Sequence, residues 1–429
     1  MSASTRIRAV KGMHDVLPQA MARWKRVEAL FRDLAERHGY AEIRTPLVEP
    51  TALFVRSIGE STDIVGKEMY SFVDKGEDSL TLRPEGTASA VRAYIEHEIH
   101  AQEAVTKWYY IGPMFRRERP ARGRYRQFWQ AGIECFGDPG PYSDAEAIAL
   151  LVEVLRAIGL SELEVVVNSI GSRSSKERYR QALVEFLKPH KEALSLESQR
   201  RLETNPLRIL DSKDPKDQAI CKNAPAILDF LSEQDRAHFE SLCELLARLG
   251  IESRVDPHLV RGLDYYSRTL FEVRGKGGEL GAQNALAGGG RYDELVEALG
   301  GPPTPAIGFA MGIERILLAC ENTQEGPSLD VWVATPDPSL LPRVLELLTL
   351  LRRDGIRADA DLRGTSLRSQ LRRAQKKGVP FVILLGPEEE AKSTLRLKDM
   401  EGHSEEEIPQ SALFFELKRR LPTRSPSAP

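Results

Sequence analysis

Two short stretches gather charged and phenolic side chains next to glycines. VRGLDYYSRT brings Arg261 together with Tyr265 and Tyr266, and AGGGRYDEL has Tyr292 soon after three consecutive glycines. Glycines let a ligand approach the backbone closely, and guanidinium and phenol groups hydrogen-bond anions and polar rings. The two stretches therefore indicate either a pocket for a small charged ligand or a polar turn beside a sheet edge.

An arginine-rich loop points to phosphate chemistry. The eleven positions after GPMF carry six arginines, opposed only by Glu118. The planar guanidinium group binds phosphate through two hydrogen bonds, although an ordinary charged hairpin tip is the alternative. Arg315 opens the helix expected in GFAMGIER, where N-terminal amides also favour anions. The loop arginines are Arg116, Arg117, Arg119, Arg122, Arg124 and Arg126.

Polar side chains also occupy one face of a predicted strand. In RQFWQAGIECFG side chains alternate between faces, so Gln130 and Glu134 share a face that is too polar for a core. In LTLRPEGTASA an extended backbone would point Glu85 and Thr87 the same way, with room between them at Gly86. Such a carboxylate accepts hydrogen bonds from an ammonium group. The alternatives are a solvated sheet face and a simple Pro-Glu-Gly turn.

The elements that carry these residues predict a mixed α and β fold. Apolar steps of three and four residues predict a helix over 19–40. Charged sequence without glycine clusters at 172–258 indicates an inserted helical module, in which one helix begins after Ser232 and ends at Gly250. Its predicted apolar stripe consists of Phe239, Leu242, Cys243, Leu246 and Leu249. Strands are predicted at 107–115, 126–137, 163–171 and 264–273, and a strand, turn and helix at 306–320.

The C-terminal part has a different pattern. Residues 321–328 are a linker by composition, and beyond them strand and helix alternate. This predicts a separate domain at 329–420 with a mostly parallel sheet. Its second helix has a basic face, which is either a platform for RNA phosphates or a solvated surface. That face consists of Arg368, Arg372 and Lys376. The tail at 421–429 is expected to be disordered.

Composition limits the class of protein. A length of 429 residues fits two or three domains, and a net charge of -3 confines nucleic-acid contact to local basic patches. The four cysteines form no CxxC pair, so we expect neither disulfides nor a metal fixed by side chains. No apolar run approaches the roughly 20 residues that span a bilayer, and the N-terminal residues lack an apolar signal core. We therefore expect a cytoplasmic protein without membrane contact.

The order of the motifs resembles the histidyl-tRNA synthetase family of class II aminoacyl-tRNA synthetases. RPEGT, GPMFRRERP with GRYRQF, LVRGLDYY, AGGGRYD and GFAMGIER follow one another as in that family, over about residues 5–420. EIRTPLVEP resembles the first class motif, which implies a homodimer interface around Pro46. The resemblance implies an α+β fold with an antiparallel β-sheet catalytic core flanked by helices, a helical insertion and a C-terminal α/β anticodon-binding domain. The implied domains are the core at 1–171 and 259–320, the insertion at 172–258 and the anticodon-binding domain at 329–420.

The resemblance also implies a reaction. The family joins L-histidine to ATP, which gives histidyl-adenylate and pyrophosphate, and then passes the histidyl group to the tRNA for histidine; Mg²⁺ accompanies the outer phosphates. Arg116 would hold the α-phosphate, Arg315 the γ-phosphate, and Arg261 both the α-phosphate and the histidine carboxylate. Arg124 is expected at ATP and, with Arg122, at the tRNA acceptor end. Histidine would be bound by Glu85, Gly86, Thr87, Gln130, Glu134, Tyr265, Tyr266 and Tyr292. Of these, Glu85, Thr87 and Gln130 would receive its amino group, Glu134 and a tyrosine of the 265–266 pair would bind the imidazole, and Tyr292 would help to close the pocket.

An alternative within the resemblance is a synthetase-like regulatory subunit of histidine biosynthesis, which binds histidine but charges no tRNA. Such paralogues tend to lose the arginines and the last domain, and both are present here. The chain departs from the family pattern at Trp129, where relatives often have histidine, and in the glycine-rich segment at 274–284. By strand alternation Trp129 faces away from Gln130.

Overall fold

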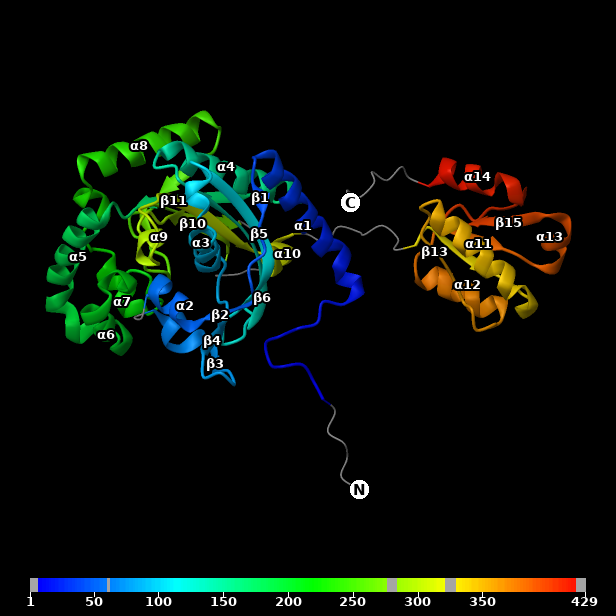
Figure 1. Ribbon diagram of the computed structural model, residues 1–429, viewed down its shortest axis with the longest axis horizontal. Helices are drawn as coiled ribbons and strands as arrows, with labels where there is room; N and C mark the ends of the chain where they lie inside the picture. Colours follow the sequence, from blue (N-terminus) through cyan, green and yellow to red (C-terminus); the bar gives the residue numbers. More distant parts are fainter. Residues whose placement is uncertain (1–6, 60–61, 276–283, 321–328, 422–429) are drawn as a thin grey trace, which may run out of the picture. The chain divides into compact units, whose positions relative to one another are not determined.

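A computed structural model describes residues 7–59, 62–275, 284–320 and 329–421 (Figure 1). The predicted linker at 321–328, nearly all of the 421–429 tail and most of the glycine-rich 274–284 segment lie outside the described residues. The chain forms two compact units, residues 1–323 and 324–429. Among the described residues, no helix has the length and apolar character needed to cross a membrane.

The first unit is built on an eight-stranded sheet in the order β1-β5-β6-β11-β10-β9-β7-β8. All neighbouring strands are antiparallel except the outer pairs β1–β5 and β7–β8. The predicted antiparallel core is therefore confirmed. In sheet order the strands are β1 (Ala41–Glu42), β5 (Thr106–Phe115), β6 (Gln127–Phe136), β11 (Ala306–Gly312), β10 (Ala285–Arg291), β9 (Ser267–Gly275), β7 (Leu163–Ser169) and β8 (Ser253–Val255).

Four helices share one hydrophobic core with this sheet. Trp24 and Phe31 of the first helix pack in that core with Ile133 of β6 and Phe309 of β11. Because side chains alternate along a strand, the polar residues of β6 lie on the opposite face. The helices are α1 (Pro18–Arg37), α4 (Pro141–Ile158), α8 (Glu233–Arg248) and α10 (Ile313–Ala319).

A smaller group of elements covers another part of the first unit. A three-stranded sheet has the order β2-β4-β3. The helix Thr51–Ile58, which follows the first strand of this sheet, contributes Phe54 and Ile58 to a buried cluster. The cluster also contains Ala88, in the first turn of the helix that follows the RPEG turn. The elements are β2 (Val48–Pro50), α2 (Thr51–Ile58), the π-helical turn η1 (Ile64–Glu68), β3 (Tyr70–Val73), β4 (Ser79–Leu82), α3 (Thr87–Glu96) and α9 (Leu295–Ala298).

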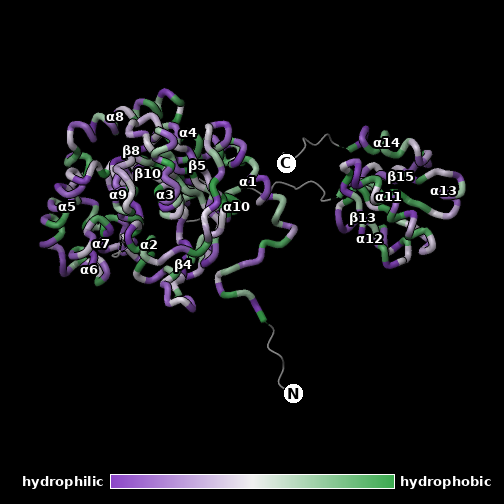
Figure 2. Tube along the Cα trace, viewed as in Figure 1, coloured by the Kyte–Doolittle hydropathy of each residue, from purple (hydrophilic) through white to green (hydrophobic). Residues whose placement is uncertain are grey.

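The 172–258 stretch is helical for most of its length. Three helices, α5 (Arg173–Leu187), α6 (Leu196–Thr204) and α7 (Pro215–Cys221), lie together at one side of the first unit (Figure 1). Hydrophilic and hydrophobic residues alternate along α5, as expected for a helix with one buried face (Figure 2). The stretch does not remain helical to its end, because β8 pairs with β7 and so belongs to the large sheet.

The helix predicted after Ser232 is α8. Ser232 is its N-cap, and its hydroxyl accepts from the backbone N–H of Asp235 at 3.1 Å. Phe239, Leu242 and Leu246 are buried in the main core. Leu249 was wrongly included in the apolar stripe: it follows the last turn and is 54% exposed.

The second unit has a five-stranded sheet in the order β13-β12-β14-β15-β16. The first three strands are parallel, as predicted, but the last two pair antiparallel. The sequence analysis did not find this hairpin, whose strand β16 is rich in glutamate. In chain order the elements are β12 (Val331–Ala334), α11 (Leu341–Arg353), β13 (Ala358–Ala360), α12 (Leu367–Lys376), β14 (Phe381–Leu384), α13 (Pro387–Lys392), β15 (Thr394–Asp399), β16 (Glu405–Pro409) and α14 (Leu413–Arg420).

Candidate active site

One pocket of the first unit brings together residues from five distant stretches of the chain. Its cavity volume is about 210 Å³. Arg122, Gly86 and Glu134 are not among its lining residues, and the second unit contributes none of them. The predicted site residues that do line it are Glu85, Thr87, Arg116, Arg124, Gln130, Arg261, Tyr265, Tyr266, Tyr292 and Arg315.

Arg261 and the triple glycine meet in this pocket. Arg261 lies on the irregular segment between β8 and β9, and its Nη1 donates to Glu272 at 2.6 Å. The glycines belong to strand β10 and not to a turn. A β-carbon on Gly288 would lie 2.6 Å from Arg261 Cζ, so only glycine leaves space for the guanidinium group. The two stretches that opened the sequence analysis thus form one wall.

Three more guanidinium groups surround the same cavity. Arg116 follows β5, and its Nε donates to the carbonyl of Pro84 at 2.8 Å. Arg315 in α10 donates through Nε to the carbonyl of Gly123 at 3.1 Å. Burial, and next the charge of Arg124, lowers the pKa of Arg315. A buried site crowded with cations favours a bound anion.

The carboxylate of Glu85 caps helix α3. Its Oε2 accepts from the backbone N–H of Thr87 at 2.6 Å and its Oε1 from that of Ala88 at 2.8 Å. The segment is therefore a turn into a helix, so of the two backbones that the sequence left open the Pro-Glu-Gly turn is the one observed. Glu85 and Thr87 nevertheless both line the pocket. Gly86 lies behind them, where an added β-carbon would be 2.7 Å from the hydroxyl of Tyr110.

Gln130 and Glu134 have different positions relative to the cavity. Gln130 lines it, and its buried Oε1 has no hydrogen-bond partner among the described residues. Glu134 is fully buried behind the wall and accepts from Thr87 Oγ1 at 2.7 Å, from Tyr110 at 3.2 Å, and from the hydroxyl of Tyr292. Burial raises the pKa of Glu134 to about 8. Gln130 therefore offers the cavity an acceptor that has no donor. Glu134, behind the wall, is a carboxyl group that burial keeps close to neutral.

Three tyrosines form the aromatic part of the wall. The ring centroids of Tyr265 and Tyr266 are 4.8 Å apart, and those of Tyr265 and Tyr292 are 5.7 Å apart. Burial raises the pKa of all three phenols, so they remain neutral hydroxyl donors. Trp129 lies on the other face of β6, where its ring contacts Trp24 edge-on at 5.9 Å.

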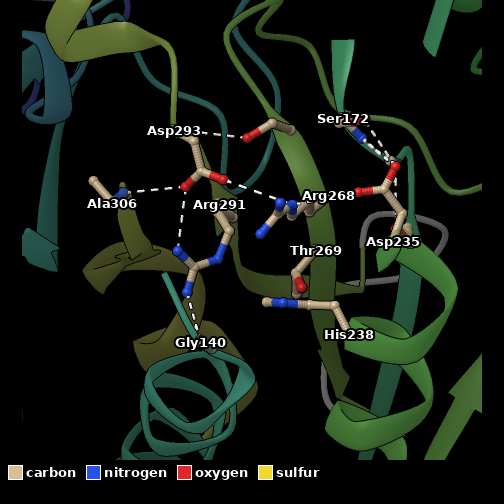
Figure 3. A network of polar contacts seen from close by, with 12 residues as sticks. Gly140, Ser172, Asp235, His238, Arg268, Thr269, Arg291, Asp293 and Ala306 are labelled. Carbon is tan, nitrogen blue, oxygen red and sulfur yellow. Dashed lines mark hydrogen bonds and ion pairs between the residues drawn. The ribbon is translucent and has the colours of Figure 1, made fainter. Parts of the chain in front are cut away.

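A polar network surrounds Arg291 at the end of β10, just before Tyr292; Figure 3 shows its contacts with Asp293 and with the carbonyl of Gly140. Arg291 is fully buried and donates to the carboxylate of Asp144 in α4 through Nε at 3.0 Å. It also donates to the carbonyls of Asp138 and Gly140, both at 2.7 Å. The second carboxylate oxygen of Asp144 contacts His238 Nε2 at 2.8 Å. These partners satisfy the buried guanidinium group and hold the end of the strand that precedes Tyr292.

In the second unit, the basic residues in and around α12 differ in whether they form ion pairs. Arg363 and Arg373 both bind Asp361, at 2.9 and 2.7 Å, which the sequence analysis overlooked because the acid precedes the basic run. Lys377, just after α12, pairs with Asp359 at 3.7 Å. Three others are exposed, and no ion pair joins them to described residues. These are Arg368, Arg372 and Lys376.

Comparisons with known proteins identify the family. The chain matches the family model described as histidyl-tRNA synthetase over residues 12–316. The chain belongs to the histidyl-tRNA synthetase family. A second model, described as an anticodon-binding domain, matches residues 330–420.

Relatives of this histidyl-tRNA synthetase family member resemble it over nearly their whole length. It is 54% identical over 403 residues to the histidine–tRNA ligase of Sorangium cellulosum, covering 94% of each chain. It is 47% identical over 414 residues to that of Thermosynechococcus vestitus, covering 96% of each. The crystal structure of apo histidyl-tRNA synthetase from S. aureus is 37% identical, with a TM-score of 0.81, and the match covers 96% of this chain and 100% of the S. aureus chain.

Two further aromatic residues of this family member, Tyr110 behind the pocket wall and Phe128 in it, were not among the predicted site residues. Tyr110 donates to Glu134 and fills the space beside Gly86. It is paired with Gly132 across β5 and β6, so the alternation that selected Glu134 would also have selected Tyr110. Phe128 lines the pocket, and the Arg116 guanidinium carbon lies 5.4 Å from the centre of its ring. The alternation that places Gln130 on this face also places Phe128 there, but its contact with Arg116 depends on where that side chain folds back.

Proposed function

We propose that this histidyl-tRNA synthetase family member ligates L-histidine to its tRNA with ATP, through a histidyl-adenylate formed in the pocket. The observation that carries the proposal is the convergence of four guanidinium groups with the carboxylate of Glu85, the amide of Gln130 and the three predicted phenols around one cavity, whose wall also contains Glu118 and Glu314. The guanidinium groups suit the phosphates of ATP, and the remaining groups suit a small amino acid with a polar ring.

The guanidinium groups would stabilise the reacting phosphates. A carboxylate oxygen of histidine attacks the α-phosphorus of ATP, and the bond from that phosphorus to the bridging oxygen breaks, so pyrophosphate leaves with the electron pair. We assign Arg116 and Arg261 to the α-phosphate, Arg261 also to the histidine carboxylate, Arg315 to the γ-phosphate, and Arg124 to the phosphates near the loop. Fixed positive charges lower the barrier because they offset the negative charges that the reaction brings together. No general base is needed, because the attacking carboxylate is already ionised at neutral pH.

The opposite end of the pocket would select histidine. The α-ammonium group fits Gln130 Oε1, which lacks a donor, together with Glu85 and Thr87 beside Gly86. An imidazole ring has one donor and one acceptor nitrogen. We assign the donor nitrogen to Glu134, where it would replace one of the hydroxyls bound in the free protein, and the acceptor nitrogen to a hydroxyl of the Tyr265 and Tyr266 pair. Tyr292 would close the pocket. An amino acid that lacked either nitrogen would leave buried groups unpaired, which is a strong basis for rejection.

The tRNA would contact both units. The second unit matches an anticodon-binding domain, and we assign its exposed basic face to the RNA backbone, consisting of Arg368, Arg372 and Lys376. Arg122 is exposed next to the pocket residue Arg124, and we assign both to the acceptor end. The domain limits inferred above, at 171, 258 and 320, are part of this proposal, and within 172–258 the elements α8 and β8 share the main core and the large sheet of the first unit.

Magnesium would enter with ATP. Mg²⁺ prefers phosphate oxygens and one or two carboxylates, and the pocket wall has Glu118 and Glu314. Glu118 already pairs with Arg124 at 2.6 Å, and Glu314 accepts the N–H of Trp129 at 3.0 Å. Because both carboxylates already have partners, we assign them a secondary role beside the ion. Mg²⁺ would neutralise charge on the outer phosphates.

We also propose a cytoplasmic homodimer. Leu47 and Val48 are adjacent residues of EIRTPLVEP and follow the short edge strand β1. Their side chains are 42% and 37% exposed. An exposed apolar segment beside a sheet edge suits an interface around Pro46. Sedimentation would test the mass, and a monomer at micromolar concentration would contradict it.

The competing role is a regulatory subunit that binds histidine without charging tRNA. The test is to incubate the purified protein with ATP, Mg²⁺, labelled histidine and a transcript of the histidine tRNA. The proposal requires acid-precipitable label that depends on both ATP and tRNA. Histidine binding in calorimetry without any charging would favour the regulatory role and contradict the proposal.

A further inference from the structure

The segment between β8 and β9 carries five residues that line the pocket without forming a helix or strand. Arg261, Tyr265 and Tyr266 all lie within it. Its start is anchored to the sheet, where the side-chain amide of Asn168 donates to the carbonyl of Leu259 at 2.9 Å. A segment without regular structure keeps its conformation only through such contacts. The contacts at its far end therefore decide where the two tyrosines and Arg261 point.

Lys176 of α5 supplies one such contact. Its Nζ donates to the carbonyl of Asp264 at 3.0 Å and to the carbonyl of Tyr266 at 3.3 Å. Burial lowers the pKa of Lys176, as expected for an ammonium group removed from water. A buried cation costs stability unless it is hydrogen-bonded, so this geometry fixes two carbonyls on either side of Tyr265.

Asn205 supplies a second contact from another part of the same helical module. It follows α6, and its Nδ2 donates to Asp264 Oδ1 at 2.7 Å. The other carboxylate oxygen of Asp264 lies against the segment after α2, since a β-carbon on Gly59 would be 2.7 Å from it. Asp264 is thus held between the helical module and the core, and Lys176 binds its backbone.

We propose that Lys176 and Asn205 are positioning residues for adenylate formation, which hold the 256–266 segment through Asp264 so that Arg261, Tyr265 and Tyr266 face the cavity. This inference rests on the proposed function. It makes the helical module part of the machinery that activates histidine, in addition to any contact with tRNA. Catalytic groups must be held to within about 0.5 Å, and a misplacement of about 1 Å can cost 10²-fold in rate.

The inference predicts a specific kinetic pattern. Loosening the segment displaces Arg261, which lowers kcat, and the two tyrosines, which raises the KM for histidine. The KM for ATP should change less than twofold, because Arg116 and Arg315 are held by other elements. A residue with a merely structural role would lower the unfolding temperature and leave both kinetic constants of the folded enzyme unchanged.

The test is histidine-dependent exchange of pyrophosphate into ATP by the full chain, without tRNA. Lys176→Met keeps the length of the side chain and removes its donors, and Asn205→Ala removes the other contact. We expect kcat to fall about 10- to 100-fold and the histidine KM to rise for Lys176→Met, with a smaller change of the same kind for Asn205→Ala. The double variant should lose less than the product of the single losses, because both residues act through Asp264.

Arg180→Gln is the matched control. It lies one turn after Lys176 on α5, is exposed, and pairs with Glu177 at 2.9 Å, so its kinetics should match those of the wild type. If the wild type shows no histidine-dependent exchange, the proposed function fails. If the wild type exchanges and Lys176→Met and Asn205→Ala keep its kcat and histidine KM, the positioning role is wrong. Should Lys176→Met not fold, Asn205→Ala decides the question.

Discussion

The guanidinium group of Arg261 lies in the space that a side chain at Gly288 would occupy, with its Cζ 2.6 Å from the position of a β-carbon there. Arg261 also pairs with Glu272 on the neighbouring strand β9 at 2.6 Å. Glycine at position 288 of β10 therefore leaves room for the Arg261 guanidinium group, which we assign to the α-phosphate.

Gly288→Ala should displace Arg261 and lower the rate of adenylate formation. The expected loss is about 10²–10³-fold, the usual effect of losing one donor to the transition state. Arg261→Ala should give a loss of the same size. Pyrophosphate exchange measures both. Gly66→Ala is the control, because a β-carbon there meets nothing within 4 Å. Wild-type exchange by Arg261→Ala would show that Arg261 has no part in activation, whereas wild-type exchange by Gly288→Ala alone would show that the guanidinium group can shift without loss.

Glu134→Gln should change the dependence of stability on pH. In the folded protein Glu134 titrates at about 8, whereas its ordinary pKa is 4.5. Between these values the folded state binds more protons than the unfolded state, so the free energy of unfolding falls as the pH rises. The slope is at most about 1.4 kcal/mol per pH unit for one proton. Glutamine does not titrate, so the stability of the wild type relative to the variant should decline from pH 5 to pH 8 in urea unfolding. Parallel profiles would mean that Glu134 is ionised in the folded protein.

Arg291→Met should destabilise the first unit. The substitution leaves the carboxylate of Asp144 buried without its main cationic partner, and breaking a buried pair in this way costs about 3–5 kcal/mol. Arg254→Met is the control, since Arg254 is 48% exposed and pairs with Glu164 on the surface; its loss should cost about 0–1 kcal/mol. Urea unfolding followed by tryptophan fluorescence compares them. Equal midpoints for the two variants would contradict the structural role of the network.

Replacing Arg372 and Lys376 with Ala should weaken tRNA charging and leave pyrophosphate exchange intact. Both residues are exposed on α12 of the second unit, whereas exchange needs only the pocket of the first. Replacing Lys418 and Arg419 with Ala removes the same charge from α14 and serves as control. The KM for tRNA should rise only in the Arg372 and Lys376 double variant. The rise should be smaller at high salt, because salt weakens contacts between basic side chains and RNA phosphates. Equal loss in exchange and charging would place α12 elsewhere in the mechanism.

The strand alternation in RQFWQAGIECFG was enough to predict that Gln130 and Glu134 share a face and that Trp129 lies on the other. It could not show that Glu134 is covered by Tyr292 and Thr87, because those contacts join segments about 158 and 47 residues away. The RPEGT segment stayed open between an extended backbone and a turn, because both fit its composition; the cap that Glu85 provides for α3 is defined only by the structure. Lys176 and Asn205 gave no sequence signal, since their partners lie in a segment whose path only the tertiary structure defines.

The central claim is that this pocket activates histidine with ATP. It is tested most directly by pyrophosphate exchange into ATP by the wild-type protein, measured separately with each of the standard amino acids and without tRNA. The account predicts exchange with L-histidine and none above background with the others. Exchange that is absent with histidine, or equally fast with another amino acid, would contradict it.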